Sequence, residues 1–178
     1  AWSALCAEDE RGDVAALEEG DWPEAPLLDT YWYQDAPYNS YAPTAPGGPD
    51  GRAWSGCAAT AMGMILQYHR WPEALVTNVS YTDATGSCTG RHAASDATLA
   101  PYKWAYIRPN YICFTPTAMK RAVGQLLYHC GVTTEMDFEA NASGTSPEKV
   151  RLALKRYFLY CVGDSVRARD LYDNSQWF

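Results

Sequence analysis

The sequence has no long apolar run and comparatively few basic residues. A helix that crosses a bilayer needs about 20 consecutive apolar residues, and no stretch of this chain approaches that length. Lysine and arginine number 14 against 21 aspartates and glutamates, which gives a formal net charge of −7. Nucleic acids and anionic membranes are bound through basic surfaces. We therefore expect neither a nucleic acid nor a membrane among the partners of this protein.

Clusters of metal ligands are also missing. The six cysteines form no Cys-x-x-Cys pair, and the three histidines do not stand close to them in a metal-binding pattern. No metal site and no cofactor is predicted. Six cysteines are compatible with a secreted or periplasmic location. Cys130 and Cys161 each close a segment with helical periodicity and could face each other, but spacing alone does not decide disulfide pairing.

The most informative stretch of the chain is residues 54–72, which reads as a loop that runs into a helix with Cys57 at the junction. Nearly every residue from Cys57 to Leu66 is small or apolar, and Pro72 ends the segment. This composition predicts a helix that is buried on all sides. A thiol in the first helical turn lies at the positive end of the helix dipole, which favours a nucleophilic thiolate. An inert buried cysteine is the alternative, because free cysteines are usually buried.

The rest of the chain alternates loops and helices. Prolines and a Gly/Pro/Asp cluster predict extended and loop structure over residues 26–53, and residues 73–101 read as irregular and polar. A helix is predicted to begin at Thr115-Pro116, to bury the stripe that ends at Cys130, and to stop at Gly131. A short strand or extended piece is expected over residues 132–138. A second amphipathic helix should follow, with Ser146 as its cap.

Several separate segments, in order along the chain, resemble the streptopain (C10-type) family of bacterial papain-like cysteine proteases. The segment around the cysteine reads Gly-Cys-Ala-Ala-Thr-Ala-Met at 56–62 and Gln-Tyr-His-Arg-Trp-Pro at 67–72. Residues 26–30 and 33–39 resemble the start of the family's mature domain, and residues 102–111 and 131–138 resemble two later blocks. The resemblance divides the chain into an acidic segment at residues 1–25, a possible propeptide remnant, and a protease part at residues 26–178.

The resemblance implies a fold class and a set of site residues. The fold would be α+β and papain-like, with this chain forming mainly the helical half and the β-sheet half expected on a second chain. Cys57 would be the nucleophile, and Gln34 would donate to the oxyanion hole together with the backbone N–H of Cys57. Ser143 and Gly144 would contact the substrate backbone. Without the resemblance, Gln34 reads as a turn-capping surface residue and residues 141–146 as a plain connector.

A general base is missing from this pattern. A cysteine protease needs one, usually histidine, and His69 would lie about 18 Å along the helix from Cys57. His129 is placed where a cation complements a helix end, and His92 falls in the polar loop. The Gly-His-Ala block in which the family carries its histidine is absent. Either the mature enzyme is cleaved, with the histidine on the C-terminal chain of the same precursor, or the sequence is truncated.

The sequence thus predicts a cysteine endopeptidase that hydrolyses protein or peptide substrates through a thioester and needs the missing C-terminal part. Two alternatives remain open. The same half-fold could serve as a non-catalytic binding or inhibitor-like module, or the thiol could support an acyl transferase.

Overall fold

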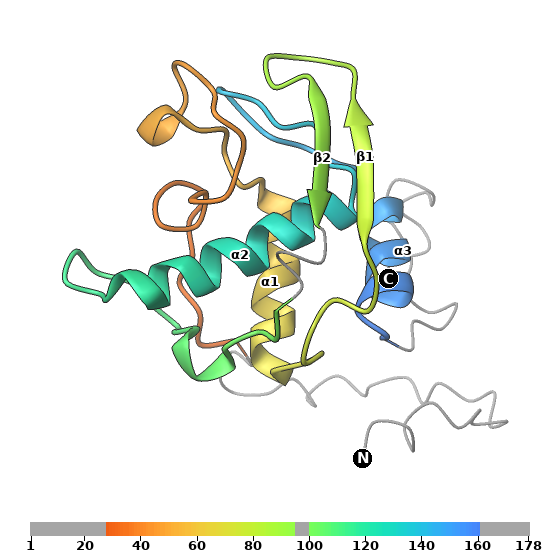
Figure 1. Cartoon of the computed structure of the whole chain (residues 1–178). Coiled ribbons are helices and arrows are strands. Elements are labelled where there is room, and N and C mark those ends of the chain that lie inside the picture. The colour runs from red at the N-terminus through yellow and green to blue at the C-terminus, as the bar shows by residue number, and fades with distance from the viewer. Residues whose placement is uncertain (1–27, 95–99, 161–178) are drawn as a thin grey trace, which may run out of the picture.

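The computed structural model describes residues 28–94 and 100–160, which form three helices and one hairpin (Figure 1). The helices are α1 (Cys57–His69), α2 (Thr117–Thr133) and α3 (Pro147–Tyr157), and the strands are β1 (Val79–Asp83) and β2 (Gly90–Ala94). Short 3-10 turns, η2 (Pro49–Gly51) and η3 (Trp104–Tyr106), lie in the loops. Among these described residues no helix combines the length and the apolar character that a bilayer crossing requires.

The helix predicted at Cys57 is confirmed, and its first residue is Cys57 itself. Gly56 precedes it with φ at 87°, a backbone conformation that glycine adopts without steric cost. A Cβ atom at this position would lie 2.7 Å from the Met136 Cε atom. At the other end Arg70 takes the left-handed conformation, and its N–H donates to the Leu66 and Gln67 carbonyls. Glycine is therefore required where α1 begins.

The prediction that α1 is buried on all sides is wrong. Met62, Gly63 and Leu66 are buried, whereas Cys57, Ala61, Ile65 and Tyr68 are exposed. These four positions are spaced by four, four and three residues, so they share one face of the helix. α1 therefore carries more apolar surface than the described residues bury.

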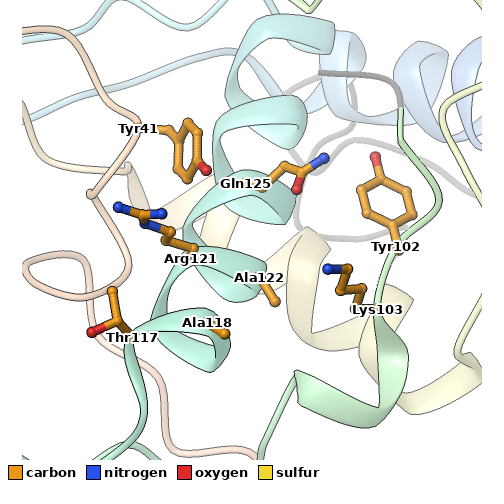
Figure 2. A pocket seen from close by; sticks show the side chains of 8 residues that line it. All are labelled: Tyr41, Tyr102, Lys103, Thr117, Ala118, Arg121, Ala122 and Gln125. Atoms are coloured by element: carbon orange, nitrogen blue, oxygen red, sulfur yellow. The ribbon is translucent and has the colours of Figure 1, made fainter. Parts of the chain in front are cut away.

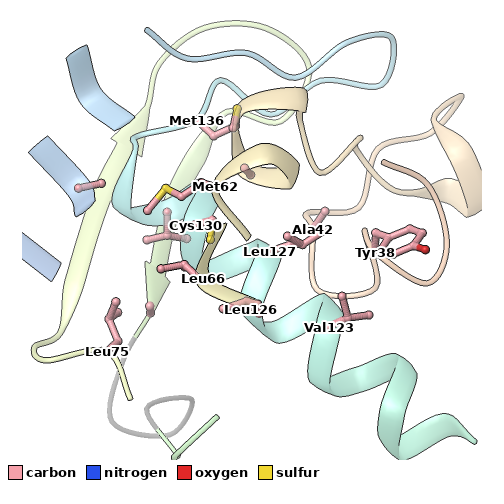
Figure 3. Packing of buried hydrophobic residues seen from close by; sticks show 14 of the residues in the cluster. Tyr38, Ala42, Met62, Leu66, Leu75, Val123, Leu126, Leu127, Cys130 and Met136 are labelled. Carbon is pink, nitrogen blue, oxygen red and sulfur yellow. The ribbon is translucent and has the colours of Figure 1, made fainter. Parts of the chain in front are cut away.

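The core lies between α1 and α2 (Figure 3), where Met62, Leu66, Val123, Leu126 and Leu127 are almost fully buried. The two helices approach closely at Gly63, because a Cβ atom there would lie 2.3 Å from the Leu127 Cδ2 atom. Of the stripe predicted on α2, Ala122, Val123, Leu126, Leu127 and Cys130 are confirmed as core, whereas Met119 is not part of it. Cys130, which belongs to this stripe, is a free thiol with no exposed surface, whereas Cys161 lies outside the described residues.

The predicted ends of α2 need correction. The helix begins at Thr117 rather than at Thr115-Pro116, because the Thr115 hydroxyl accepts from the Ile112 N–H instead of capping the helix. It also continues through Gly131 to Thr133. Gly131 does not stop the helix, since its missing side chain makes room for Phe138, whose Cζ atom would lie 2.7 Å from a Cβ there. Residues 132–133 are consequently helical and not part of a strand.

The irregular stretch predicted over residues 73–101 contains the antiparallel hairpin β1–β2, with Tyr81 opposite His92. The hairpin was missed because both strands are short and mostly polar, and only Val79 and Tyr81 of β1 alternate with polar residues. Figure 1 shows the hairpin beside the C-terminal half of α2, with α3 next to it. The α3 prediction is confirmed, and the Ser146 hydroxyl accepts from the Lys149 N–H as the cap.

Candidate active site

Cys57 lies in a cleft of about 460 Å³ at the N-terminus of α1. The cleft is lined by residues from the segment before α1 and from α1 itself: Trp32, Tyr33, Gln34, Asp35, Trp54, Cys57, Thr60, Ala61 and Met64. Cys57 is exposed and carries a free thiol. The structure therefore brings together two residues that are 23 positions apart in the sequence, Cys57 and Gln34.

Hydrogen bonds fix the loop of Gln34 against the start of α1. The Gln34 carbonyl accepts from the Ser55 N–H at 3.0 Å and from the Ser55 hydroxyl at 3.1 Å. Ser55 is buried, and its hydroxyl also lies 3.4 Å from that of Thr60 in the first turn of α1. Ser55 thus positions the backbone of residue 34 next to the cysteine while the Gln34 side chain lines the cleft.

The chemistry available in this cleft follows from the helix end. The first backbone N–H groups of a helix have no intrahelical acceptor, so they are free to bind a developing anion. No acidic residue lies in the first turn of α1 and no side chain caps it. An exposed thiol, unpaired N–H donors and a side-chain amide that share one cleft are suited to attack on a carbonyl group and to binding of the resulting oxyanion.

Ser143 and Gly144 lie next to this region but do not line the cleft. Gly144 pairs with Asp137 through two backbone hydrogen bonds of 2.9 and 3.1 Å. Ser143 is buried, and its hydroxyl accepts from the Glu139 N–H at 3.0 Å. The Ser143 carbonyl oxygen would lie 3.3 Å from a Cβ atom at Gly56. The loop is therefore adjacent to the start of α1, and the hydroxyl of Ser143 serves to hold the loop together.

None of the three histidines of the sequence lines the cleft. His69 is at the far end of α1, where its ring packs against Tyr68 and Tyr160. His92 is on β2, buried, with Nε2 3.0 Å from the Cys88 carbonyl oxygen and 4.0 Å from Asp83 Oδ2. It is not in a loop as predicted.

His129 corrects a second prediction, because it is not a cation at a helix end. It is fully buried inside α2, four residues before the helix terminates, and its Nδ1 atom lies 2.8 Å from the Tyr102 hydroxyl oxygen. Burial lowers the pKa of His129 to about 4, since the charged form would lose its hydration. His129 is neutral at physiological pH and belongs to the core.

The aromatic walls of the cleft were missed by the sequence analysis. Trp32 is buried, Trp54 is half-buried, and Tyr33 is exposed beside Gln34. Trp32 donates its indole N–H to the Arg108 carbonyl at 2.9 Å, which fixes this wall to a distant segment. Both tryptophans precede Cys57 in the sequence, Trp32 by 25 residues and Trp54 by three, and only the fold shows that they line the same cleft. No group of three His, Cys, Asp or Glu side chains within residues 28–94 and 100–160 is arranged to hold a metal ion.

The part of the chain that forms this cleft also matches known proteins. Residues 32–178 match the Peptidase C10 family. The thiol protease/hemagglutinin PrtT of Porphyromonas gingivalis is 30% identical over 163 residues, and streptopain of Streptococcus pyogenes is 26% identical over 147 residues. The chain spans 18% of the length of the first and 37% of the second, whereas the matches cover 90% and 75% of this chain.

Solved structures of cysteine proteases are also similar to this chain. The active wild-type interpain A cysteine protease of Prevotella intermedia superposes with a TM-score of 0.70 at 28% identity, over 86% of this chain and 61% of that one. A fragment of prointerpain A from the same organism gives a TM-score of 0.71, again at 28% identity, over 86% of this chain and 48% of that fragment.

Proposed function

Because the chain belongs to the Peptidase C10 family, we propose that it carries the nucleophile of a cysteine endopeptidase of the streptopain type. The observation that best supports this function is the exposed thiol of Cys57 at the N-terminus of α1, in the same cleft as Gln34. Protein or peptide substrates would bind across this cleft. A secreted or periplasmic location is part of the proposal.

In the proposed reaction the Cys57 thiolate attacks the carbonyl carbon of the scissile peptide bond. The Gln34 side-chain amide and the Cys57 backbone N–H donate to the oxyanion of the tetrahedral intermediate. Loss of the amine, which takes up a proton, leaves a thioester that water then hydrolyses. The loop of Ser143 and Gly144, next to the start of α1, would contribute backbone contacts to the substrate.

The base in this proposal is a histidine from a C-terminal part of the same precursor, on a second polypeptide or as a continuation of the chain. Two features support it. The three histidines of this sequence lie outside the cleft. The apolar face of α1 formed by Ala61, Ile65 and Tyr68 starts at Cys57 and is not covered by the described residues. A part that packs on this face would be held close to the thiol.

Competitive alkylation tests the proposal with a control built into the chain. Cys57 and Cys113 are both exposed free thiols, but Cys113 does not line the cleft. With limiting iodoacetamide at neutral pH, Cys57 should react much faster than Cys113 when the C-terminal part is present, and the peptidase activity should disappear in parallel. Peptide mass spectrometry reads out both sites. Equal rates at the two cysteines would contradict an activated nucleophile.

This experiment and two activity assays separate the remaining hypotheses. Fast alkylation of Cys57 in this chain alone would show that no further part is needed to activate it. A folded, complete protein that is inert toward casein would favour a binding or inhibitor-like module. Transfer of the acyl group to an added amine in preference to water would favour an acyl transferase.

A further inference from the structure

A second cleft lies on the N-terminal half of α2 (Figure 2) and has a volume of about 330 Å³. It is lined by Tyr41, Tyr102, Lys103, Thr117, Ala118, Arg121, Ala122 and Gln125, none of which lines the cleft of Cys57. Lys103 and Arg121 are both exposed and contribute two positive charges to it. Among the described residues no carboxylate lies within ion-pair distance of either cation, since the ion pairs there are His92–Asp83, Lys149–Glu135 and Arg151–Glu148.

The surroundings of this cleft are basic over a long stretch of sequence. Residues 101–134 contain four basic residues, Lys103, Arg108, Lys120 and Arg121, and no aspartate or glutamate. The N-terminus of α2 adds partial positive charge, because no side chain caps it and no acidic residue lies in its first turn. The cleft is therefore an electropositive site in a protein whose net charge is negative.

The negative charge of the protein is concentrated in one segment. Residues 1–25 contain eight aspartates and glutamates and a single arginine, a formal charge of −7. This equals the formal charge of the whole chain, so residues 26–178 carry thirteen residues of each sign and are neutral. A cleft whose two cations have no carboxylate partner among the described residues and a strongly acidic segment of the same chain have complementary charges.

The first described residues lie beside the loop that leads to the cleft. The Tyr31 N–H donates to the Pro109 carbonyl at 2.8 Å, and the Trp32 indole donates to the Arg108 carbonyl. Residues 31–32 therefore lie beside the loop that carries Lys103 and Arg108. Because ten extended residues reach about 35 Å, carboxylates at residues 18–24 are within reach of the cleft.

We propose that the acidic segment at residues 8–24 docks in this cleft, with its carboxylates paired to Lys103 and Arg121. Arg121 can hold a carboxylate through two parallel N–H bonds, while Lys103 acts as a point charge. Tyr41 provides a hydroxyl group at the edge of the cleft. Docking holds the segment at a site separate from Cys57, so it does not depend on the proposed peptidase activity.

Zero-length cross-linking of the intact protein tests this proposal, because a carbodiimide joins a lysine amine to a carboxylate only when the two groups are in contact. Peptide mass spectrometry should find Lys103 joined to carboxylates of residues 8–24. Lys149, whose Nζ is 3.0 Å from Glu135 Oε2, is the positive control. Lys155, exposed in the last turn of α3, is the negative control. Raising the salt to 1 M, where the screening length falls to about 3 Å, should reduce the Lys103 product at least about fivefold.

Matched variants, and mixtures of isotope-labelled with unlabelled protein, test which segment occupies the cleft. Arg121→Glu should reduce the Lys103 product severalfold, whereas Arg156→Glu on α3 should leave it unchanged. Replacing Glu18, Glu19 and Asp21 by their amides should have the same effect as Arg121→Glu. Lys103 products that join labelled to unlabelled chains in a mixture would show docking between copies and overturn the proposal. Equal coupling of the acidic segment to Lys103 and Lys155 would overturn it as well.

Discussion

The two faces of α1 have similar composition but different surroundings. Met62, Gly63 and Leu66 are buried against α2, whereas Ala61, Ile65 and Tyr68 are exposed on the side that begins at Cys57. On the buried face the side chains stabilise the fold, whereas on the exposed face they follow Cys57 along the helix and are not covered by the described residues. The difference shows that apolar composition alone does not tell which face of a helix is buried in the core. Four predictions test this contrast.

The largest effect is expected at the exposed end of α1. In the proposed peptidase, replacing Cys57 with alanine should lower kcat by about 10⁶-fold, because loss of the proposed nucleophile removes the whole covalent route. The unfolding free energy should change by less than about 0.5 kcal/mol, since the side chain is exposed. Peptide hydrolysis assays and urea denaturation measure the two quantities. A variant that keeps appreciable activity would show that another residue is the nucleophile.

Gln34 should contribute less to catalysis than Cys57 and nothing to the stability of the fold. Its replacement by alanine would remove the donor to the oxyanion that we propose, so kcat should fall about 10²- to 10³-fold with KM nearly unchanged. Because the backbone of Gln34, and not its side chain, binds Ser55, the fold should be retained. Steady-state kinetics with a peptide substrate give kcat and KM separately. A rise in KM alone would instead indicate a role in substrate binding.

Two adjacent residues allow a direct comparison of the faces. Leu66→Ala should cost about 2–5 kcal/mol of unfolding free energy because it leaves a cavity in the core. Ile65→Ala should cost less than about 0.5 kcal/mol in this chain alone. With the C-terminal part present, the cost at Ile65 should become measurable. A large cost at Ile65 in the chain alone would mean that residues outside the described ranges already cover this face.

The smallest predicted effect is the pH dependence of stability that arises from the buried His129 on α2. Its pKa is lowered to about 4, so between pH 6.5 and 4 the unfolded state binds the proton that the folded state excludes. Stability should therefore fall as the pH decreases through this range, by about 2 kcal/mol from pH 7 to pH 5 on account of this group. Denaturant unfolding across this pH range measures the slope. His129→Gln should flatten it, and an unchanged slope would assign the pH dependence to other groups.

Local signals were sufficient for several elements of this protein. The proline at position 147 and the serine before it predict the start of α3, which the structure confirms. The glycine before Cys57 and the small and apolar residues after it likewise predict α1. These signals act within one turn of the helix, so they are read without knowledge of the rest of the fold.

Other elements depend on contacts between distant residues. The hairpin β1–β2 is mostly polar, with alternation limited to Val79 and Tyr81 of β1, and α2 continues past Gly131, against which the ring of Phe138 packs closely. The walls of the cleft include Trp32 and Trp54, which are placed there by contacts between distant segments, the Trp32 indole bond to the Arg108 carbonyl and the Ser55 bonds to the Gln34 carbonyl. The protonation state of His129 depends on its burial, which its position in the sequence of a helix does not reveal.

The sequence by itself determined the cysteine motif, the resemblance to a protease family, the positions where α1 and α3 begin and the charge asymmetry between residues 1–25 and the rest. These properties reside in neighbouring residues or in composition. Only the tertiary structure decided which face of α1 is open, that Gln34 shares a cleft with Cys57, and that Lys103 and Arg121 meet in a second cleft. Such properties depend on which distant segments pack together, because burial and proximity are set by long-range contacts that no local pattern encodes.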